Sequence, residues 1–447
     1  MRILLPLTLA LAVAPGGAAA SPTGVAPARE FAPRQLLVKF EGQRLEHTLT
    51  LPRGTGVRQA AALLRRNPRV IYAQPNYIAT ASAVEPGPFD PNDSGSIEAT
   101  AAAAREAGRW AYEQWNFLDS RGPATEELPT SPGGIDAVDA WQNLIEAGRP
   151  GVAGVTVAVL DTGVAYRSLG TTVLGSPDFS PSQFVPGYDF VSHDGLPLDT
   201  NGHGTHVAGT IAERTDNEVG LTGLAYRAKL MPVRVLNRIG IGYANEIARG
   251  IRFAVVHHAD VINMSFNFEC GQRVRAVNEA LRYAYRQGVV TVASTGNLHS
   301  ESCVSGPATG PHVIGVGGST EGACMGWYAL AGPSVDVVAP GGGRPREGCL
   351  SVLSRTIDQV TYRYHSTTEF SIPRYYEGTS MAAAHVSGVA AMILASGVLG
   401  PQPSPEAKVQ AVLRRLQQTA RDLGYPPSLQ GAGLIDAGRA TAPGRRP

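Results

Sequence analysis

From about residue 135 onward, short continuous apolar runs alternate with longer stretches of helical periodicity. The run Val155–Leu160 (VTVAVL) has no polar face, as expected for a parallel strand covered on both sides. This alternation predicts an α/β fold, with a doubly wound, mostly parallel sheet and helices on both faces. Ligands in such sheets bind beyond the carboxyl ends of the strands. Further strands are expected at 230–236, 260–264, 289–293, 313–316 and 335–338, and helices at 203–213, 243–257, 273–287 and 380–396.

The N-terminus has the layout of an export signal. Arg2 precedes the apolar run Ile3–Val13, and Ala18–Ala20 supply small residues before Ser21. The apolar run is too short to span a membrane, so the pattern predicts a signal peptide over residues 1–20 rather than an anchor. A buried N-terminal strand is the alternative. We therefore expect a secreted protein, extracellular or periplasmic.

The remaining chain divides into a small module, a linker and one large domain. Residues 35–40 and 70–77 are expected as strands and 57–67 as a helix between them, which together predict a small βαβ-like module. Residues 83–112 are rich in Pro, Gly, Ser and Ala, which indicates a linker or insertion. The predicted boundaries are 1–20 for the signal, 21–82 for the module, 83–112 for the linker, 113–440 for the α/β domain and 441–447 for a tail.

The net charge argues against two classes of partner, and the number and spacing of the cysteines indicate their chemical state. The formal net charge of +1 predicts no general attraction to nucleic acid or to anionic membranes. Cys270, Cys303, Cys324 and Cys349 are even in number and lack metal-ligand spacing, so two disulfides are expected in an oxidising compartment. Three connectivities are possible, and the sequential pairing of 270 with 303 and 324 with 349 is preferred.

Three short segments carry candidate catalytic side chains: VAVLDTGV with Asp161, NGHGTHVAGT with His203 and GTSMAAAHVSG with Ser380. A serine hydroxyl is a poor nucleophile until a base takes its proton, and the imidazole then needs a carboxylate to fix its tautomer. Each residue also has a simpler interpretation. Ser380 could serve merely as a helix cap. His203 and His206 together could indicate a zinc site, although a further ligand at suitable spacing is lacking.

The three segments resemble the catalytic signatures of subtilisin-like serine proteases, the subtilase family (peptidase family S8). The resemblance continues through VINMS, VASTGN, VIGVGG, VDVVAPG and GAGLIDAGRA, and so covers residues 113–440. It implies a serine endopeptidase that acts through an acyl-enzyme. Asp161 would orient the imidazole, His203 would be the base and Ser380 the nucleophile, in the chain order found in subtilisin. His385, five residues after Ser380, is expected to be structural.

The resemblance also implies the groups that hold the substrate. Asn297 matches the residue whose amide helps to bind the oxyanion, with the N–H of Ser380 as the second donor. An extended peptide would bind by β-augmentation between two edge segments. The implied substrate-binding residues are Gly240, Ile241, Gly242, Ser265, Phe266, Asn267, Ser294, Thr295 and Gly296.

The N-terminal module resembles the propeptide of this family, which assists folding and inhibits the enzyme. The resemblance therefore implies a self-processing zymogen, with cleavage near residues 79–85 and the propeptide as an intramolecular inhibitor. The expected partners are peptide and protein substrates, and the enzyme is expected to be a monomer with no cofactor for catalysis. Subtilases commonly carry structural calcium; Asp178, Asp194 and Asp199 are candidate ligands, but no contiguous pattern identifies a metal site.

The sequence departs from the family pattern at three places. Phe266-Asn267-Phe268 stands where a leucine and two glycines are usual, so the preference for the residue before the scissile bond (P1) cannot be inherited. Ala384 replaces a usual proline, and residues 95–110 resemble an insertion. Two alternatives to hydrolysis stay open: peptide transfer or ligation by the same acyl-enzyme, and a non-catalytic peptide-binding module of the same fold.

Overall fold

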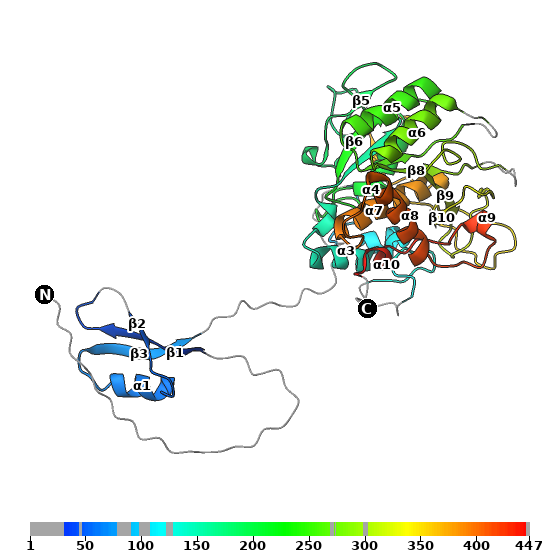
Figure 1. Cartoon of the computed structure of the whole chain (residues 1–447). Helices are drawn as coiled ribbons and strands as arrows, with labels where there is room; N and C mark the ends of the chain where they lie inside the picture. The colour runs from blue at the N-terminus through cyan, green and yellow to red at the C-terminus, as the bar shows by residue number, and fades with distance from the viewer. Residues whose placement is uncertain are drawn as a thin grey trace. The chain divides into compact units, whose positions relative to one another are not determined.

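The computed structural model describes residues 31–43, 47–77, 91–97, 108–121, 128–268, 272, 274–297 and 303–443. The chain divides into two compact units, Met1–Pro86 and Gly87–Pro447 (Figure 1). The expected signal peptide and the expected cleavage region at 79–85 lie outside the described residues.

The first unit is a three-stranded sheet with one helix. Its strands β1 (Phe31–Phe40), β2 (His47–Thr50) and β3 (Val70–Tyr77) lie in the order β2-β1-β3, with helix α1 (Val57–Leu64) between β2 and β3 in the chain. Both pairings of β1 are antiparallel, so the strands and helix form a small α+β module. The helix and both predicted strands are present, but periodicity alone does not determine strand direction. The order leaves β3 at an edge of the sheet.

The second unit is built on a seven-stranded parallel sheet, in the order β10-β9-β8-β7-β4-β6-β5. All six strands expected in this domain are present. The strand order runs one way from β4 through β6 to β5 and the other way from β7 to β10, which is the doubly wound arrangement. The strands are β4 (Thr156–Asp161), β5 (Tyr188–Asp189), β6 (Lys229–Arg234), β7 (Val261–Met264), β8 (Val290–Ser294), β9 (Val313–Ser319) and β10 (Val337–Pro340).

Helices cover both faces of this sheet because crossovers between parallel strands are right-handed, so reversing the winding direction moves the helices to the other face. Helices α5 (Ala244–Val256) and α6 (Arg275–Arg286) follow β6 and β7 and lie side by side, whereas α4 (His203–Ala212) packs against α7 (Thr379–Ser396) (Figure 1). Other helices are α2 (Trp110–Glu113), α3 (Ala137–Glu146), α8 (Pro405–Thr419), α9 (Pro427–Gln430) and α10 (Ala437–Thr441), with 3-10 turns at Trp115–Phe117, Pro150–Val152 and Pro181–Gln183.

Helix α7 is the central helix of the core. It is built from small and aliphatic residues that are buried on all sides from Thr379 to Ile393. A carbon side chain on Gly388 would lie 2.9 Å from the Cβ atom of Leu224, so only glycine permits this close approach. Within the described residues, α7 alone is long and apolar enough to cross a membrane, and 78% of it is buried in the protein. Its hydrophobicity is therefore explained by its place in the core.

Residues 110–117, which include several aromatic side chains, attach the start of the second unit to α7. Trp110 and Phe117 are fully buried and pack edge-to-face on Trp141 of α3. Asn116 donates its Nδ2 amine to Nε2 of His385 (2.8 Å), while Nδ1 of His385 donates to the carbonyl of Met381 (2.8 Å). Burial lowers the pKa of His385 to about 4, so its ring is neutral and structural, as expected from the sequence.

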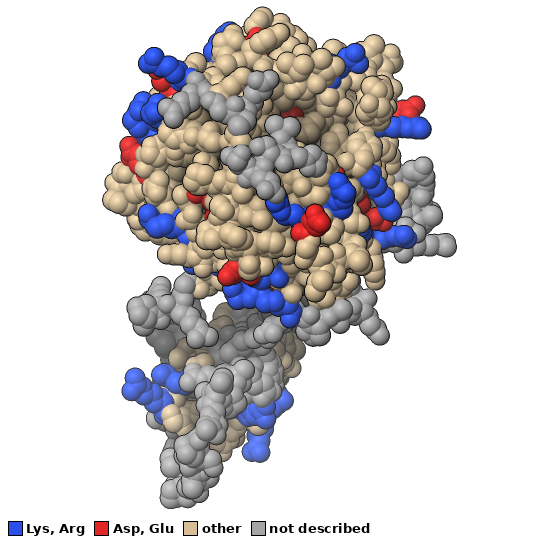
Figure 2. Space-filling view, turned by 90° about the vertical axis from the view of Figure 1, so that its right-hand side faces the viewer, with Lys and Arg blue, Asp and Glu red and all other residues tan. Residues whose placement is uncertain are grey.

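A long connection between β10 and α7 carries a short hairpin, β11 (Thr361–Tyr362) with β12 (Phe370–Ser371). A disulfide joins Cys349, near the start of this connection, to Cys324, which lies between β9 and β10. This confirms one of the two preferred pairings. Cys303 is also disulfide-bonded, whereas Cys270 lies outside the described residues. On the face drawn in Figure 2, basic and acidic side chains are scattered singly or in small groups with uncharged surface between them.

The bond between Asn116 and His385 can be tested by stability. Replacing Asn116 with Ala leaves the buried Nε2 atom of His385 without a donor, which should lower the free energy of unfolding by about 1–3 kcal/mol. Urea unfolding measures this loss. Asn116→Leu keeps most of the side-chain volume and should lose a similar amount, whereas the exposed Asn245→Ala should stay within about 0.5 kcal/mol of the wild type. A wild-type midpoint in Asn116→Leu would show that packing, not the hydrogen bond, matters here.

Candidate active site

Three neighbouring strands end at the same level of the sheet. Leu160 of β4 pairs with Met264 of β7, which in turn pairs with Ala293 of β8. The residues that follow these three are Asp161, Ser265 and Ser294. They therefore lie at one edge of the sheet, at the carboxyl ends of the strands, where ligands bind in such sheets. These three residues are the framework of the candidate site.

Asp161 and His203 are joined by a hydrogen bond. Nδ1 of His203 donates to Oδ1 of Asp161 at 2.8 Å, and the N–H of Thr162 donates to the same oxygen at 2.7 Å. Asp161 is fully buried, whereas 23% of the His203 side chain is exposed. Burial by itself lowers the pKa of His203, but the charge and hydrogen bond of Asp161, with the charge of Asp199, outweigh burial and raise it above the ordinary value.

A second buried carboxylate, Asp199, holds the turn that leads into α4. Its Oδ1 atom accepts the N–H groups of Asn201 (2.8 Å) and Gly202 (3.0 Å) and the hydroxyl of Thr162 (2.9 Å). Its Oδ2 atom accepts the N–H (3.0 Å) and the hydroxyl (2.6 Å) of Thr205. Because these five donors fill the roughly four lone-pair sites of the carboxylate, we assign Asp199 to this turn and not to calcium binding.

The start of α7 orients the side chain of Asn297. Oδ1 of Asn297 accepts both the N–H and the hydroxyl of Thr379, each at 2.9 Å. With its carbonyl oxygen so occupied, the exposed side chain of Asn297 has its Nδ2 amine available to another acceptor. Gly378 precedes Thr379 with φ of 135°, and a side chain there would lie 2.7 Å from Nδ2 of Asn297. A glycine is therefore required beside the amine.

Ser380 lies in the first turn of α7, between the ends of β7 and β8. Its hydroxyl donates to the carbonyl of Ser265 at 3.1 Å, and the hydroxyl of Ser265 donates to the carbonyl of Ser380 at 2.9 Å. Asn263 of β7 donates in turn to the Ser265 hydroxyl at 2.9 Å. These bonds place the Ser380 hydroxyl at the strand edge, at the positive end of a helix.

The two expected edge segments meet in one cleft that also contains His203. A cavity of about 390 Å³ lies between residues 240–242 and 265–268. Asn267 reaches from this cleft to the third segment, because its Nδ2 amine donates to the carbonyl of Ser294 at 2.7 Å. The cavity is also lined by Thr162, Asn201, Leu236, Ile247 and Phe268, which the sequence analysis did not single out.

The adjacent histidine does not form a zinc site with His203. His206 is fully buried, donates Nε2–H to the carbonyl of Ile357 at 2.9 Å and stacks on Tyr376. Burial lowers its pKa to about 3, so it stays neutral. Among the residues that the structure describes, no group of three or more His, Cys, Asp or Glu side chains is placed to hold a metal ion.

Comparison with known proteins identifies the family. A sequence model described as "Subtilase family" matches residues 152–433. The chain belongs to the subtilase family. Subtilisin DY from Bacillus licheniformis is 34% identical over 310 residues, which cover 69% of this chain and 97% of that protein. Thermitase from Thermoactinomyces vulgaris is 33% identical over 266 residues, covering 60% and 82%.

A solved structure agrees with this assignment. A protease from Pseudoalteromonas arctica aligns with a TM-score of 0.60 and 28% identity, over 79% of this subtilase and 99% of that chain. Together these relatives show that the protein is a serine endopeptidase, a hydrolase of the subtilisin type. Peptides are the substrate class that this assignment entails.

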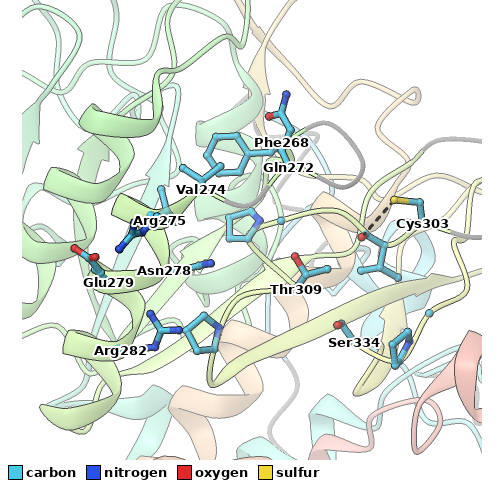
Figure 3. Close-up of a pocket in the computed structure, with 17 residues that line it drawn as sticks. Phe268, Gln272, Val274, Arg275, Asn278, Glu279, Arg282, Cys303, Thr309 and Ser334 are labelled. Atoms are coloured by element: carbon cyan, nitrogen blue, oxygen red, sulfur yellow. Dashed lines mark hydrogen bonds between the residues drawn. The ribbon is translucent and has the colours of Figure 1, made fainter.

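A larger hollow lies behind the cleft of this subtilase. It has a volume of about 790 Å³ and lies between α6 and residues 303–311, with Gly332–Ser334 on its far side. Figure 3 shows Arg275, Asn278 and Arg282 of α6 facing Thr309 across it. Phe268 lines both this hollow and the cleft.

The electrostatic arrangement around His203 predicts its titration. In a ¹³C-histidine NMR titration, His203 should titrate above the usual 6.5, while His206 and His385 remain neutral at pH 6 to 8. Asp161→Asn removes the charge that favours the imidazolium, so burial then dominates and the pKa of His203 should fall below 6.5. An unchanged His203 titration in Asp161→Asn would contradict the role assigned to this bond.

Proposed function

We propose that Asp161, His203 and Ser380 hydrolyse peptide bonds through an acyl-enzyme. The hydrogen bond from His203 Nδ1 to Asp161 carries this proposal, because it fixes the tautomer whose Nε2 atom has a free lone pair. His203 then takes the proton of Ser380 as the hydroxyl attacks the carbonyl carbon, and gives it to the leaving amine. Water attacks the acyl-enzyme in the second half of the reaction, with His203 again as base.

The Ser380 hydroxyl must turn from the carbonyl of Ser265 toward His203 before it reacts. Catalytic hydrogen bonds of unliganded enzymes are often formed only when the substrate is bound. The rotation is about one side-chain bond and needs no movement of α7. The resting hydrogen bond to Ser265 is therefore compatible with the proposed role.

The negative charge of the tetrahedral intermediate would be held by Nδ2 of Asn297 and by the N–H of Ser380. Support comes from the two bonds of Thr379 to Oδ1 of Asn297, which aim the amine before the substrate arrives. Donors held in advance do not have to reorganise during the reaction, which is why such sites stabilise charge more effectively than water. The start of α7 adds the positive end of its dipole.

We also propose export and synthesis as a zymogen. The pattern of residues 1–20 and the Cys324–Cys349 disulfide favour an oxidising compartment. The first unit would act as propeptide, folding assistant and inhibitor. Its edge strand β3 leads directly to the expected cleavage region at 79–85, and an edge strand has free backbone groups with which to pair. We expect the mature enzyme to be a monomer.

Nothing in the described residues favours ligation over hydrolysis. Ala384 is buried within α7, and its methyl group has no polar atom with which to bias the acyl-enzyme toward an amine. Ligation stays an alternative that product analysis with an added amine nucleophile would test. A non-catalytic module is the other alternative, and it predicts no reaction of Ser380 with a fluorophosphonate.

We further propose a structural calcium ion beside Asp93 and Asp178. Both carboxylates are fully buried, and Leu221 N–H and the amide of Asn217 donate to Asp178. Burial raises the pKa of Asp93 to about 7 and that of Asp178 well above its usual range. A side chain on Gly220 would lie 1.8 Å from Oδ2 of Asp178, so the loop forms a tight cradle.

The donor set suits calcium, which prefers oxygen ligands. Asp93, Asp178 and the side-chain oxygen of Asn217 would hold the ion. Glu213 adds a third buried carboxyl group in this region, and burial raises its pKa well above the usual range too. Of the candidates named from sequence, Asp194 is exposed and the carboxylate of Asp199 accepts five protein donors, which leaves Asp178, whose two oxygens accept one donor each.

Ser380→Ala should abolish proteolysis, fluorophosphonate labelling and propeptide release together, because all three need the same hydroxyl. Mass spectrometry of the purified full chain measures processing, and a casein assay measures proteolysis. A Ser396→Ala variant, at the far end of the same helix, should still be labelled. Processing of isolated Ser380→Ala protein would contradict self-cleavage, and an unlabelled wild type would contradict the catalytic role.

Chelation should destabilise the enzyme if the proposed ion is present. EDTA should lower the melting temperature, and calcium at one hundred times its Kd should restore about 2.7 kcal/mol of stability. Asp178→Asn should lose this calcium dependence, whereas the exposed Asp194→Asn should keep it. An EDTA-insensitive melting temperature in the wild type would contradict the site.

A further inference from the structure

The proposed function determines where the P1 side chain must go. With the scissile carbonyl between the Ser380 hydroxyl and Nδ2 of Asn297, that side chain enters the slot between segment 265–268 and segment 294–297. These segments follow β7 and β8, which are neighbours in the sheet. The side chains that occupy this slot therefore determine which P1 residues the enzyme accepts. The inference that follows rests on the proposed function.

Asn267 lies across the slot. Its Nδ2 amine donates to the carbonyl of Ser294 at 2.7 Å, and its Oδ1 atom accepts the hydroxyl of Ser294 at 3.2 Å. Two hydrogen bonds to the same residue fix both ends of the carboxamide, so the side chain is a bridge that connects segment 265–268 to segment 294–297. Ser294 is fully buried, whereas Asn267 is exposed, so the bridge presents one face to the cleft.

Gly296, close to the bridge, is tightly surrounded. Gly296 has φ of 107°, and a carbon placed on it would lie 2.8 Å from the hydroxyl oxygen of Ser305 and 3.2 Å from Cδ1 of Leu330. The same carbon would lie 3.7 Å from Cγ of Asn267. Side chains from three segments thus surround Gly296.

Phe268, the residue after Asn267, is also fixed by a neighbouring segment. The N–H of Phe268 donates to the carbonyl of Gly306 at 2.7 Å, which ties the two sides together. The ring of Phe268 lies 3.5 Å from where a side chain of Gly306 would begin. Phe268 also lines both the cleft and the larger hollow.

We propose that Asn267 restricts this subtilase to small, uncharged P1 residues, namely Gly, Ala and Ser. A larger side chain would have to displace the carboxamide and leave the buried carbonyl of Ser294 without its donor. Such unpaired buried groups are costly enough to reduce the rate roughly tenfold or more. The residues named around the slot carry no formal charge, so a charged P1 side chain would gain no partner there.

The test compares kcat/KM for succinyl-Ala-Ala-Pro-X p-nitroanilides with X as Ala or Phe. The wild type should prefer Ala by at least about tenfold. Asn267→Gly removes the bridge and should raise the Phe-to-Ala ratio by at least about tenfold. Asn245→Gly changes an exposed asparagine on the outer first turn of α5 and should leave the ratio at its wild-type value.

Fluorophosphonate labelling of Ser380 separates failure of this inference from failure of the proposed function. If Ser380 is labelled but the wild type cleaves X = Phe as well as X = Ala, the inference is wrong while the function stands. An unchanged ratio in Asn267→Gly would overturn it equally. Should that variant not fold, cleavage-site mapping by the wild type on a peptide library decides: predominance of Gly, Ala and Ser at P1 supports the inference, and predominance of Phe, Tyr or Leu refutes it.

Discussion

The candidate site depends on the hydrogen-bonded register of β4, β7 and β8. Because Leu160, Met264 and Ala293 are paired across the sheet, the chain leaves all three strands at one level. Asp161, Ser265 and Ser294 are thereby fixed relative to one another before any side-chain interaction is considered. The carboxylate that accepts from His203, the hydrogen-bonded position of the Ser380 hydroxyl and the anchor of Asn267 each depend on one of these three residues.

The two helices that complete the site meet this edge through glycines. Gly202 and Gly378 precede α4 and α7 with φ of 107° and 135°, values that side-chain-bearing residues rarely adopt. They let each helix begin abruptly, so that His203 and Ser380 lie in first turns facing the strand ends. The core then keeps both helices in place, since α4 packs on α7 and α7 is buried along most of its length.

Much of this could be predicted from the sequence. Apolar runs and helical periodicity indicated the strands and helices of the large domain, because burial on both faces leaves a local pattern. The segments around Asp161, His203 and Ser380 were recognisable because each combines a reactive side chain with glycines and small residues. Helix α8, in contrast, was not anticipated: its apolar positions are few, and only Val409, Ala411, Val412 and Leu416 are buried.

Pairings between distant segments leave no comparable local pattern. Asn116 and His385 are 269 positions apart, and nothing near either residue indicates the bond. Asp93 joins Asp178 only because the start of the domain folds back on the loop at 214–221. The departure from the family pattern at Phe266-Asn267-Phe268 was visible in the sequence. Its effect on P1 preference could be inferred only from the structure, which shows that Asn267 contacts Ser294. Strand direction in the first unit was likewise undetermined by periodicity.

The level ends of β4, β7 and β8 also determine where this protein can change in length during evolution. One residue added inside any of these strands would reverse the side chains beyond it and shift them by about 3.3 Å relative to their neighbours. Length can instead be added between β10 and α7, where the β11–β12 hairpin lies outside the strand register. New surface can therefore be acquired beside the cleft without altering the geometry within it.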